Sequence, residues 1–244
     1  MKELNHSALI INAHPDDGEM AMGGTLLLLV KAGYKVTNVS LTGGEAGTFG
    51  SKEIREKEFI NAQKFLGSEG ILLDFPDTAL ENTVQARHAV VQIIREKKPG
   101  IVFAPYLRND DADFHGMNNR DHPVAGHIAS EAVKLARLKN VLPEYPPHHV
   151  PLLLFYMIAP GKKATLIVDV TEVYDDIKIL ISHYQSQLQL PQNTKSGNPE
   201  SSPVISRLIA HRINDGSSRR VKYAESFISE MPLLISDLKN LALL

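Results

Sequence analysis

The residues best suited to chemistry lie in the segment AHPDDGE, where a histidine and three acids fall within six residues. His14 and Asp17 are three residues apart, so a turn that enters a helix can direct both side chains to the same side. An imidazole and a carboxylate bind divalent metal ions, and Asp16 would then lie beside the ion. The alternative is an ordinary turn in which an aspartate caps the next helix, but a cap needs only one acid. We therefore interpret the segment as part of a metal site.

A third metal ligand has to come from another segment, because catalytic zinc usually has three protein ligands and one water. The chain has no cysteine, so histidines and carboxylates must supply it. The densest group of candidates is NDDADFHGMNNRDHPVAG, which contains His115 and His122 among several aspartates. His122 precedes Pro123, and proline is favoured in the first turn of a helix. His122 would therefore lie at a helix N-terminus, above the end of the preceding strand.

A glycine-rich stretch, TGGEAGTFG, precedes an arginine in the charged run KEIREKE. The stretch lacks the Lys-Ser/Thr pair of a P-loop and does not match GxGxxG, so we expect a loop at the border of the site. Arg55 could bind an anionic part of a substrate, or it could be a solvated surface residue. Spacing alone leaves both interpretations open.

Hydrophobic patterns predict the elements that would position these residues. We expect strands at 7–13, 35–41, 70–73, 101–104, 152–158 and 166–170, and helices at 18–32, 52–66, 83–97, 123–138 and 204–213. Such alternation predicts an α/β fold with a mostly parallel sheet flanked by helices, with ligands at the carboxyl ends of the strands. We treat residues 1–244 as a single domain with a polar surface loop at about 188–203.

The composition excludes several classes of partner. A net charge of -2 and a pI near 6.6 give no electrostatic reason to expect binding to nucleic acid or to an anionic membrane. The apolar runs are too short to span a bilayer. The first residues, MKELNHSALIINA, lack the pattern of a signal peptide, so we expect a cytoplasmic protein.

Three motifs together resemble the LmbE-like or PIG-L family of zinc-dependent N-acetylglucosamine de-N-acetylases: AHPDDGE followed by GG, LTGGEAGTFGSKEIREKE, and RDH. The segments FPD, FYMI, KILISHYQSQ and VKYAESF are similar to the branch that contains bacillithiol-biosynthesis deacetylases. The resemblance covers most of the chain. It implies a Rossmann-like fold and a homo-oligomer, either a trimer or a hexamer.

The resemblance also implies roles for individual residues. It implies Zn²⁺ ligation by His14, Asp17 and His122, although Fe²⁺ would fit the same donors. It implies that Asp16 is the general base and that Arg55 contacts the substrate. Asp121 matches the acid that lies beside the third metal ligand.

The sequence departs from the family at one catalytic position. The family motif HPDH is replaced here by NRDH, so Asn119 stands where the family has a histidine. In the family that histidine helps to stabilise the tetrahedral intermediate or to protonate the leaving amine. An amide can donate a hydrogen bond but cannot act as an acid. We therefore expect Asn119 and the nearby His115 to share this role.

The expected function is metal-dependent removal of the acetyl group from a small molecule containing N-acetylglucosamine, for example N-acetylglucosaminyl-malate. A metal-dependent phosphoesterase is one alternative, but many such enzymes use two ions, and the sequence offers one set of three ligands. A non-catalytic sugar-binding relative is the other alternative, and the loss of the family histidine at Asn119 favours it.

Overall fold

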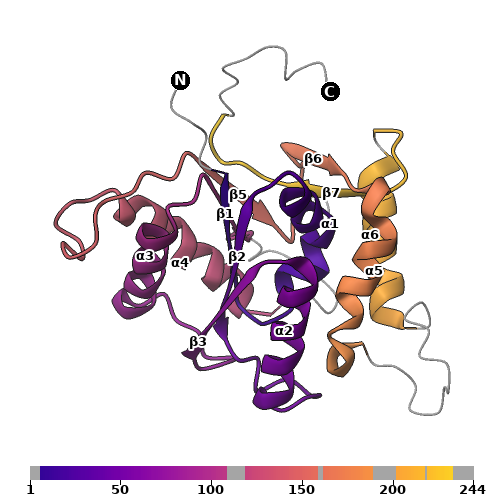
Figure 1. Ribbon diagram of the computed structural model, residues 1–244, viewed down its shortest axis with the longest axis horizontal. Helices are drawn as coiled ribbons and strands as arrows, with labels where there is room; N and C mark the ends of the chain where they lie inside the picture. Colours follow the sequence, from indigo (N-terminus) through magenta and orange to yellow (C-terminus); the bar gives the residue numbers. More distant parts are fainter. Residues whose placement is uncertain (1–5, 109–118, 159–161, 189–201, 218, 233–244) are drawn as a thin grey trace.

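The computed structural model describes residues 6–108, 119–158, 162–188, 202–217 and 219–232. At its centre is a sheet of five parallel strands in the order β3-β2-β1-β4-β5 (Figure 1). The strands are β1 (Ser7–Asn12), β2 (Lys35–Thr42), β3 (Glu69–Phe75), β4 (Ile101–Pro105) and β5 (Leu152–Tyr156). The predicted α/β fold with a parallel sheet is confirmed.

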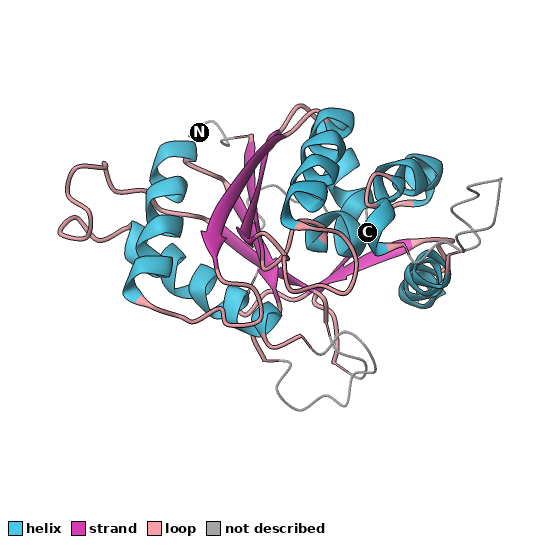
Figure 2. Cartoon of the chain, turned by 90° about the horizontal axis from the view of Figure 1, so that it is seen from below, coloured by secondary structure: helices cyan, strands magenta, loops and turns pink. Residues whose placement is uncertain are grey.

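Helices cover both faces of the sheet, which lies between two helical layers (Figures 1 and 2). The helices are α1 (Asp17–Lys31), α2 (Lys52–Leu66), α3 (Val84–Lys97), α4 (Asp121–Ala136), α5 (Tyr174–Ser182) and α6 (Pro203–Ser217). Helices α3 and α4 lie on one face, and α1, α2 and α5 lie on the other, with α6 on the outside. No helix among the described residues is both long enough and apolar enough to cross a membrane.

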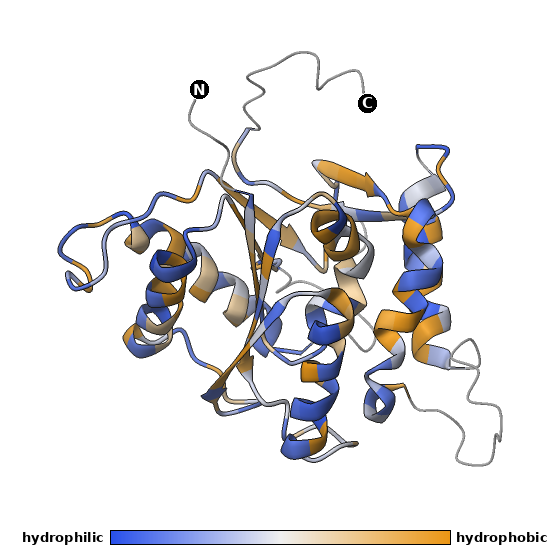
Figure 3. Ribbon diagram, in the orientation of Figure 1, coloured by the Kyte–Doolittle hydropathy of each residue, from blue (hydrophilic) through white to orange (hydrophobic). Residues whose placement is uncertain are grey.

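Strand β1 shows why the sheet needs helices on both sides. All six of its residues are buried. Leu9 and Ile11 pack with the core formed by α3 and α4, whereas Ala8 and Ile10 pack with α1, α2 and α5. A continuous apolar run is typical of a parallel strand that is covered on both faces. The hydropathy colouring shows the apolar residues of the helices mostly turned toward the sheet (Figure 3).

The last part of the chain departs from the expected pattern. Strand β6 (Leu166–Asp169) pairs antiparallel with β7 (Ala224–Phe227) in a separate two-stranded sheet. A bridge between Phe155 and Ile228 connects this small sheet to β5. The strand at 166–170 was expected, but β7 and α5 were not. Residues 189–201, most of the predicted polar loop, lie outside the described residues.

The helix boundaries agree with the sequence to within a few residues, with two informative differences. Helix α4 begins at Asp121 rather than at Pro123, so Asp121 and His122 are part of its first turn. Helix α1 contains a break at Met22, which has φ -139° and ψ 27°. Helix α2 ends as predicted at Gly67, whose φ of 74° is the left-handed conformation that glycine adopts readily.

The order of the strands locates the site. From β1 the chain moves outward to β2 and β3, and then returns to place β4 on the opposite side of β1. In open α/β sheets, ligands bind at the carboxyl ends of the strands where the order reverses in this way. The segments after β1 and β4, AHPDDGE and NRDH, meet at this point.

Candidate active site

The turn after β1 carries the first predicted ligands, and hydrogen bonds hold it in place. The carboxylate of Asp17 accepts a hydrogen bond from the backbone N–H of His14 at 2.8 Å, which closes the turn. The carbonyl of Ala13 accepts from both the backbone N–H and the hydroxyl of Thr42, at 3.0 and 2.8 Å, and so fixes the turn to the end of β2. The turn is therefore rigid on both sides of His14.

The first turn of α4 brings His122 to this turn. His122 Nε2 lies 3.1 Å from Asp17 Oδ1, and His14 Nδ1 lies 3.5 Å from Asp17 Oδ2. Ligand atoms of all three residues lie within 4.8 Å of one another. Two imidazoles and one carboxylate form a donor set that catalytic zinc uses, so these side chains fit a metal ion.

The cluster of negative charges at the site also favours binding of a cation. His14 lies beside the carboxylates of Asp17, Asp77 and Asp121. Burial opposes protonation of His14, but these acids outweigh it and raise its pKa to about 12. The pKa of His122 is also raised, since Asp17 outweighs the effect of burial. A divalent ion would take the place of the protons that otherwise balance these acids.

Asp77 is a site residue whose role the sequence did not reveal. Its Oδ1 lies 3.1 Å from His14 Nε2, and its Oδ2 accepts a hydrogen bond from the backbone N–H of Ala46 at 2.8 Å. Burial would raise the pKa of Asp77, but the contacts with His14 and Ala46 lower it below its usual range. A carboxylate that holds one nitrogen of an imidazole orients the other nitrogen toward a metal. The sequence signal was only its position two residues after β3, in the motif FPD.

Asp121, the first residue of α4, contributes a second carboxylate next to His14. It is fully buried, and its Oδ2 accepts from the backbone N–H of Thr78 at 2.7 Å and lies 3.7 Å from His14 Nε2. Its Oδ1 is buried and has no hydrogen-bond partner among the described residues. His14, Asp77 and Asp121 form a second group with metal-ligand spacing, which shares His14 with the first.

Asn119 connects the start of α4 to His14. Its Oδ1 accepts from the backbone N–H of Asp121 at 2.9 Å, so its Nδ2 faces His14 Nε2 at 3.2 Å. Carboxylates only accept hydrogen bonds, so a proton on His14 Nε2 would be donated to Asp77, and Asn119 Nδ2, itself a donor, would then only lie next to this nitrogen. The predicted partner of Asn119, His115, lies outside the described residues.

Arg55 is a buried residue of the site rather than a solvated one. It is 5% exposed, and it donates to Asp16 Oδ1 at 3.0 Å and to the carbonyl of Gly44 at 2.7 Å. Gly44 has a φ of +66°, and a Cβ there would lie 2.0 Å from Nη1 of Arg55. Glycine in TGGEAG thus makes room for the arginine.

Asp16 is more accessible than its neighbour. Its side chain is 15% exposed, against 6% for Asp17. Burial raises the pKa of Asp16, Arg55 opposes this, and the adjacent Asp17 adds to the increase. The pKa of Asp17 is instead well below its usual range, because His122 and His14 outweigh the effect of burial. The pKa values of these two adjacent acids are thus shifted in opposite directions, so Asp17 favours the charged form and Asp16 binds a proton more readily.

Comparison with known proteins identifies the family of the chain. Residues 9–133, just over half of the chain, match the family described as GlcNAc-PI de-N-acetylase, PIG-L. The chain belongs to this family. A diacetylchitobiose deacetylase of Thermococcus kodakarensis is 31% identical over 73% of this chain and 69% of its own length. A probable N-acetyl-alpha-D-glucosaminyl L-malate deacetylase 2 of Bacillus anthracis is 31% identical over 54% of this chain and 61% of its own length. The resemblance found in the sequence motifs is confirmed.

Two further comparisons concern fold and reaction class. The structure of an N,N'-diacetylchitobiose deacetylase from Pyrococcus horikoshii has a TM-score of 0.78 and 26% identity, and the match covers 91% of this chain and 83% of that one. A 4-oxalmesaconate hydratase of Pseudomonas putida is 24% identical over 98% of this chain and 94% of its own length. Similar sequences therefore include proteins named for deacetylation and a protein named for hydration.

Proposed function

We propose that this protein is a metal-dependent hydrolase that removes the acetyl group from a small molecule containing N-acetylglucosamine. The observation that carries the proposal is the convergence of His14, Asp17 and His122 within 4.8 Å, with the side chain of Asp16 beside them. Membership of the family supports it, as do relatives named as deacetylases of diacetylchitobiose and of N-acetylglucosaminyl malate.

The metal we propose is Zn²⁺, held by His14, Asp17 and His122, with Fe²⁺ as a second ion that suits these donors. When bound, such an ion lowers the pKa of water and polarises a carbonyl group. Asp77 and Asp121 would hold the ring of His14 in the orientation that ligation requires.

The side chains of the chain itself move the protons. Asp16 would accept a proton from the water that attacks the acetyl carbon. The protonated carboxyl of Asp16, or His115, would then give a proton to the amine as the C–N bond breaks, which yields acetate and the free amine. Arg55 would keep Asp16 oriented through the bond to its Oδ1. Asn119 would donate a hydrogen bond to the reacting amide, and His115 remains the predicted source of a proton at this position.

The substrate class follows from the relatives and not from the geometry. We propose an N-acetylglucosaminyl conjugate such as N-acetylglucosaminyl-malate, with Arg55 as the predicted contact for its anionic part. The cytoplasmic location and the trimeric or hexameric assembly stay predictions, as does the absence of nucleic-acid and membrane partners.

Acetate release tests the proposal. Zinc-loaded protein is incubated with N-acetylglucosamine, N,N'-diacetylchitobiose and N-acetylglucosaminyl-malate, and acetate is measured over time. The wild type should release acetate from at least one of them. Asp16→Asn should lose about 10²–10⁴-fold in rate while still binding zinc, because it removes the base alone. Asp17→Ala should lose the metal, and Asp175→Asn on the surface should change neither.

A hydratase is the second candidate, because the relative that covers 98% of this chain is named for that activity. Deacetylation and hydration both need a base next to an activated water, and they differ in the carbon that is attacked. Loss of ultraviolet absorbance from 4-oxalmesaconate, with no acetate from the sugars, would favour hydration. Phosphate release would favour a phosphoesterase, and sugar binding without turnover would favour a binding protein.

A further inference from the structure

Helix α1 is broken directly after the residues that form the candidate site. Met22 is not helical, and the two parts of the helix meet there. In an unbroken α-helix, the backbone N–H of Gly24 would donate to the carbonyl of Met20, four residues earlier. Here both groups bond to side chains from the far end of the sequence.

A buried ion pair occupies the place of this missing hydrogen bond. Arg212 of α6 donates from Nη2 to the carbonyl of Met20 at 3.0 Å. Glu225 of β7 accepts from the backbone N–H of Gly24 at 3.0 Å. Arg212 and Glu225 bond to each other, with Nη2 and Oε1 separated by 2.7 Å. Arg212 and Glu225 therefore each bond to one of the two backbone groups that lack their helical hydrogen bond at the break.

Glu225 also starts the second part of α1. Its Oε2 accepts from both the backbone N–H and the hydroxyl of Thr25, at 2.7 and 2.8 Å. A carboxylate at a helix N-terminus satisfies unpaired N–H groups and interacts favourably with the helix dipole. Glu225 is thus an N-terminal cap provided by a strand about 200 residues further along the chain.

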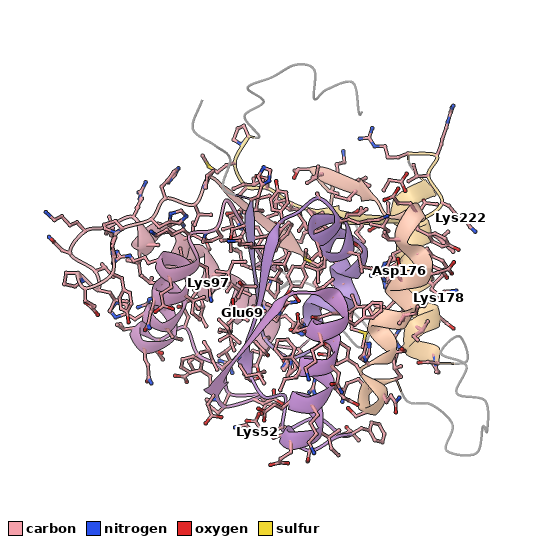
Figure 4. The ribbon with its side chains drawn as sticks, in the orientation of Figure 1. Lys52, Glu69, Lys97, Asp176, Lys178 and Lys222 are labelled. Atoms are coloured by element: carbon pink, nitrogen blue, oxygen red, sulfur yellow. The ribbon has the colours of Figure 1, made fainter. Side chains whose placement is uncertain are left out.

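The pair differs from the surface ion pairs of the molecule. The side chains of Arg212 and Glu225 are 4% and 1% exposed. Lys97 and Glu69, which join α3 to β3 at the surface, are 29% and 50% exposed (Figure 4). Exposed pairs contribute little to stability, whereas removal of one partner of a buried pair leaves an uncompensated charge. Glu225 lies in VKYAESF, a motif to which the proposed reaction assigns no task.

The pair reaches the site through a single residue. The carbonyl of Met20 bonds to Arg212, and the backbone N–H of Met20 donates to the carbonyl of Asp16 at 2.9 Å. Asp16 and Asp17 lie at the start of the short first part of α1. Because the break separates this part from the rest of the helix, Arg212 is one of the groups that hold it, together with the bonds of Glu19 to Asn38 and Gln63.

We propose that Arg212 and Glu225 are positioning residues, which hold the first part of α1 so that Asp17 faces the two histidines and Asp16 faces the reacting water. This proposal rests on the proposed function only in the roles that it gives to Asp16 and Asp17. The pair touches no reacting atom and acts through the backbone of Met20.

The test compares Glu225→Gln with a variant that affects packing alone. The introduced amide would keep the shape of the side chain and one acceptor, but would leave Arg212 without its counter-charge. Val90→Ala is the matched control, because Val90 is fully buried in α3 on the opposite face of the sheet. Thermal unfolding gives the melting temperature of each variant. The affinity for Co²⁺, the Co²⁺ absorption spectrum and kcat are then measured below the lowest of these temperatures.

We expect Glu225→Gln to weaken Co²⁺ binding by about tenfold, the lower end of what loss of support around a metal site costs. The Co²⁺ spectrum should change, and kcat at saturating metal should fall more than KM rises. Val90→Ala should lower the melting temperature with unchanged affinity and spectrum. A Glu225→Gln protein that melts earlier but keeps wild-type affinity, spectrum and kcat would overturn the proposal.

Two further measurements keep the inference separate from the proposed function. Arg212→Lys retains the charge but cannot bond to Glu225 and to the carbonyl of Met20 through several nitrogens at once. It should therefore weaken Co²⁺ binding and lower kcat, but by less than Glu225→Gln. Amide hydrogen exchange across residues 17–26, measured without metal, should become faster in Glu225→Gln and not in Val90→Ala. If the wild type binds no Co²⁺ and releases no acetate, the proposed function fails, and exchange at these amides still decides whether the pair positions the turn. Exchange in Glu225→Gln that is as slow as in the wild type would overturn the positioning role of the pair.

Discussion

At the scale of single residues, Asp16 is affected by two neighbours of opposite charge. Arg55 lies 3.0 Å from it, and Asp17 is adjacent in the chain. Burial and Asp17 raise the pKa of Asp16, and Arg55 limits the increase. A general base works only in its charged form, so the acidic limb of the pH–rate profile should report this balance.

Removal of Arg55 tests that balance. In Arg55→Met the pKa of Asp16 should rise, so the acidic limb of kcat/KM should move to higher pH by at least about one unit. The rate should therefore fall most below neutral pH and recover as the pH increases. Arg87→Met, which removes a peripheral arginine paired with Glu131, should leave the profile in place. A large increase in KM with an unmoved limb would instead support the predicted role of Arg55 as a substrate contact.

The sequence predicted the residues of the site better than their tasks. His14 and Asp17 stood out by their types and their position after a strand, and the family resemblance added His122 from a segment with two candidate histidines. The structure brings these three side chains together. The role of Asp77 could not be predicted, since a single acid after a strand is common and its contact with His14 depends on the alignment of β3 with β1. The contact between Arg55 and Asp16 was also hidden, because the close approach of Gly44 to the arginine is a property of the folded loop.

At the scale of elements, the sequence predicted β1, β4 and β5 because they are continuous apolar runs, and β2 because it is rich in residues that favour strands. It did not predict β7, which is four residues long and contains a glutamate. That glutamate is buried because it caps the second part of α1, a contact between residues about 200 positions apart. Patterns of hydrophobic residues along the chain contain no information on such a pairing.

The two glycines that follow AHPDDGEMAM should differ in their tolerance of a side chain. A Cβ at Gly24 would lie 2.6 Å from Cβ of Val170 and 2.8 Å from Cδ1 of Ile177, inside the packing of α1 on α5. Gly24→Ala should therefore destabilise the protein by about 1–3 kcal/mol, less the modest gain in helix propensity from alanine. Urea denaturation measures the difference.

Gly23→Ala is the control in the same motif. A Cβ there would meet Cδ2 of Leu180 at 3.3 Å, and the end of a leucine side chain can move by a few tenths of an ångström. We expect a change within about 0.5 kcal/mol, since surrounding contacts stay intact. Equal losses for both variants would contradict the close contact with Val170 as the reason for glycine at position 24.

At the scale of the whole molecule, a network of buried polar side chains connects strands β1 and β2 to α1, α2 and β5. Glu19 Oε1 accepts from Nδ2 of Asn38 and from Nε2 of Gln63. Asn12 Nδ2 donates to Asn38 Oδ1 at 3.1 Å, and the hydroxyl of Tyr156 donates to Asn12 Oδ1 at 2.7 Å. The network therefore includes α1, α2, β1, β2 and β5.

The carboxyl of Glu19 makes global stability depend on pH. Burial is the main cause that raises its pKa from 4.5 to about 7. Between these values the folded protein binds the proton more tightly than the unfolded chain does, so the free energy of unfolding falls as the pH rises. By pH 8 this group alone should reduce stability by about 3 kcal/mol.

Glu19→Gln should remove this cost. The amide oxygen can still accept from Asn38 and Gln63, and the amide nitrogen takes the place of Oε2, which is buried without a partner among the described residues. Denaturation at several pH values should show a small gain in stability for the variant at pH 5. The gain should grow to about 3 kcal/mol at pH 8.

Glu172→Gln serves as the control, since it makes the same substitution at a side chain that is 65% exposed, and it is measured at the same pH values. A gain for Glu19→Gln that does not increase with pH would mean that Glu19 is charged when folded and is balanced by its amide donors. A gain that does increase would mean that α1 retains a destabilising acid three residues from Asp16. Its negative charge would then rise with pH beside the proposed base, so the same variant should also lower the pH at which Asp16 becomes active.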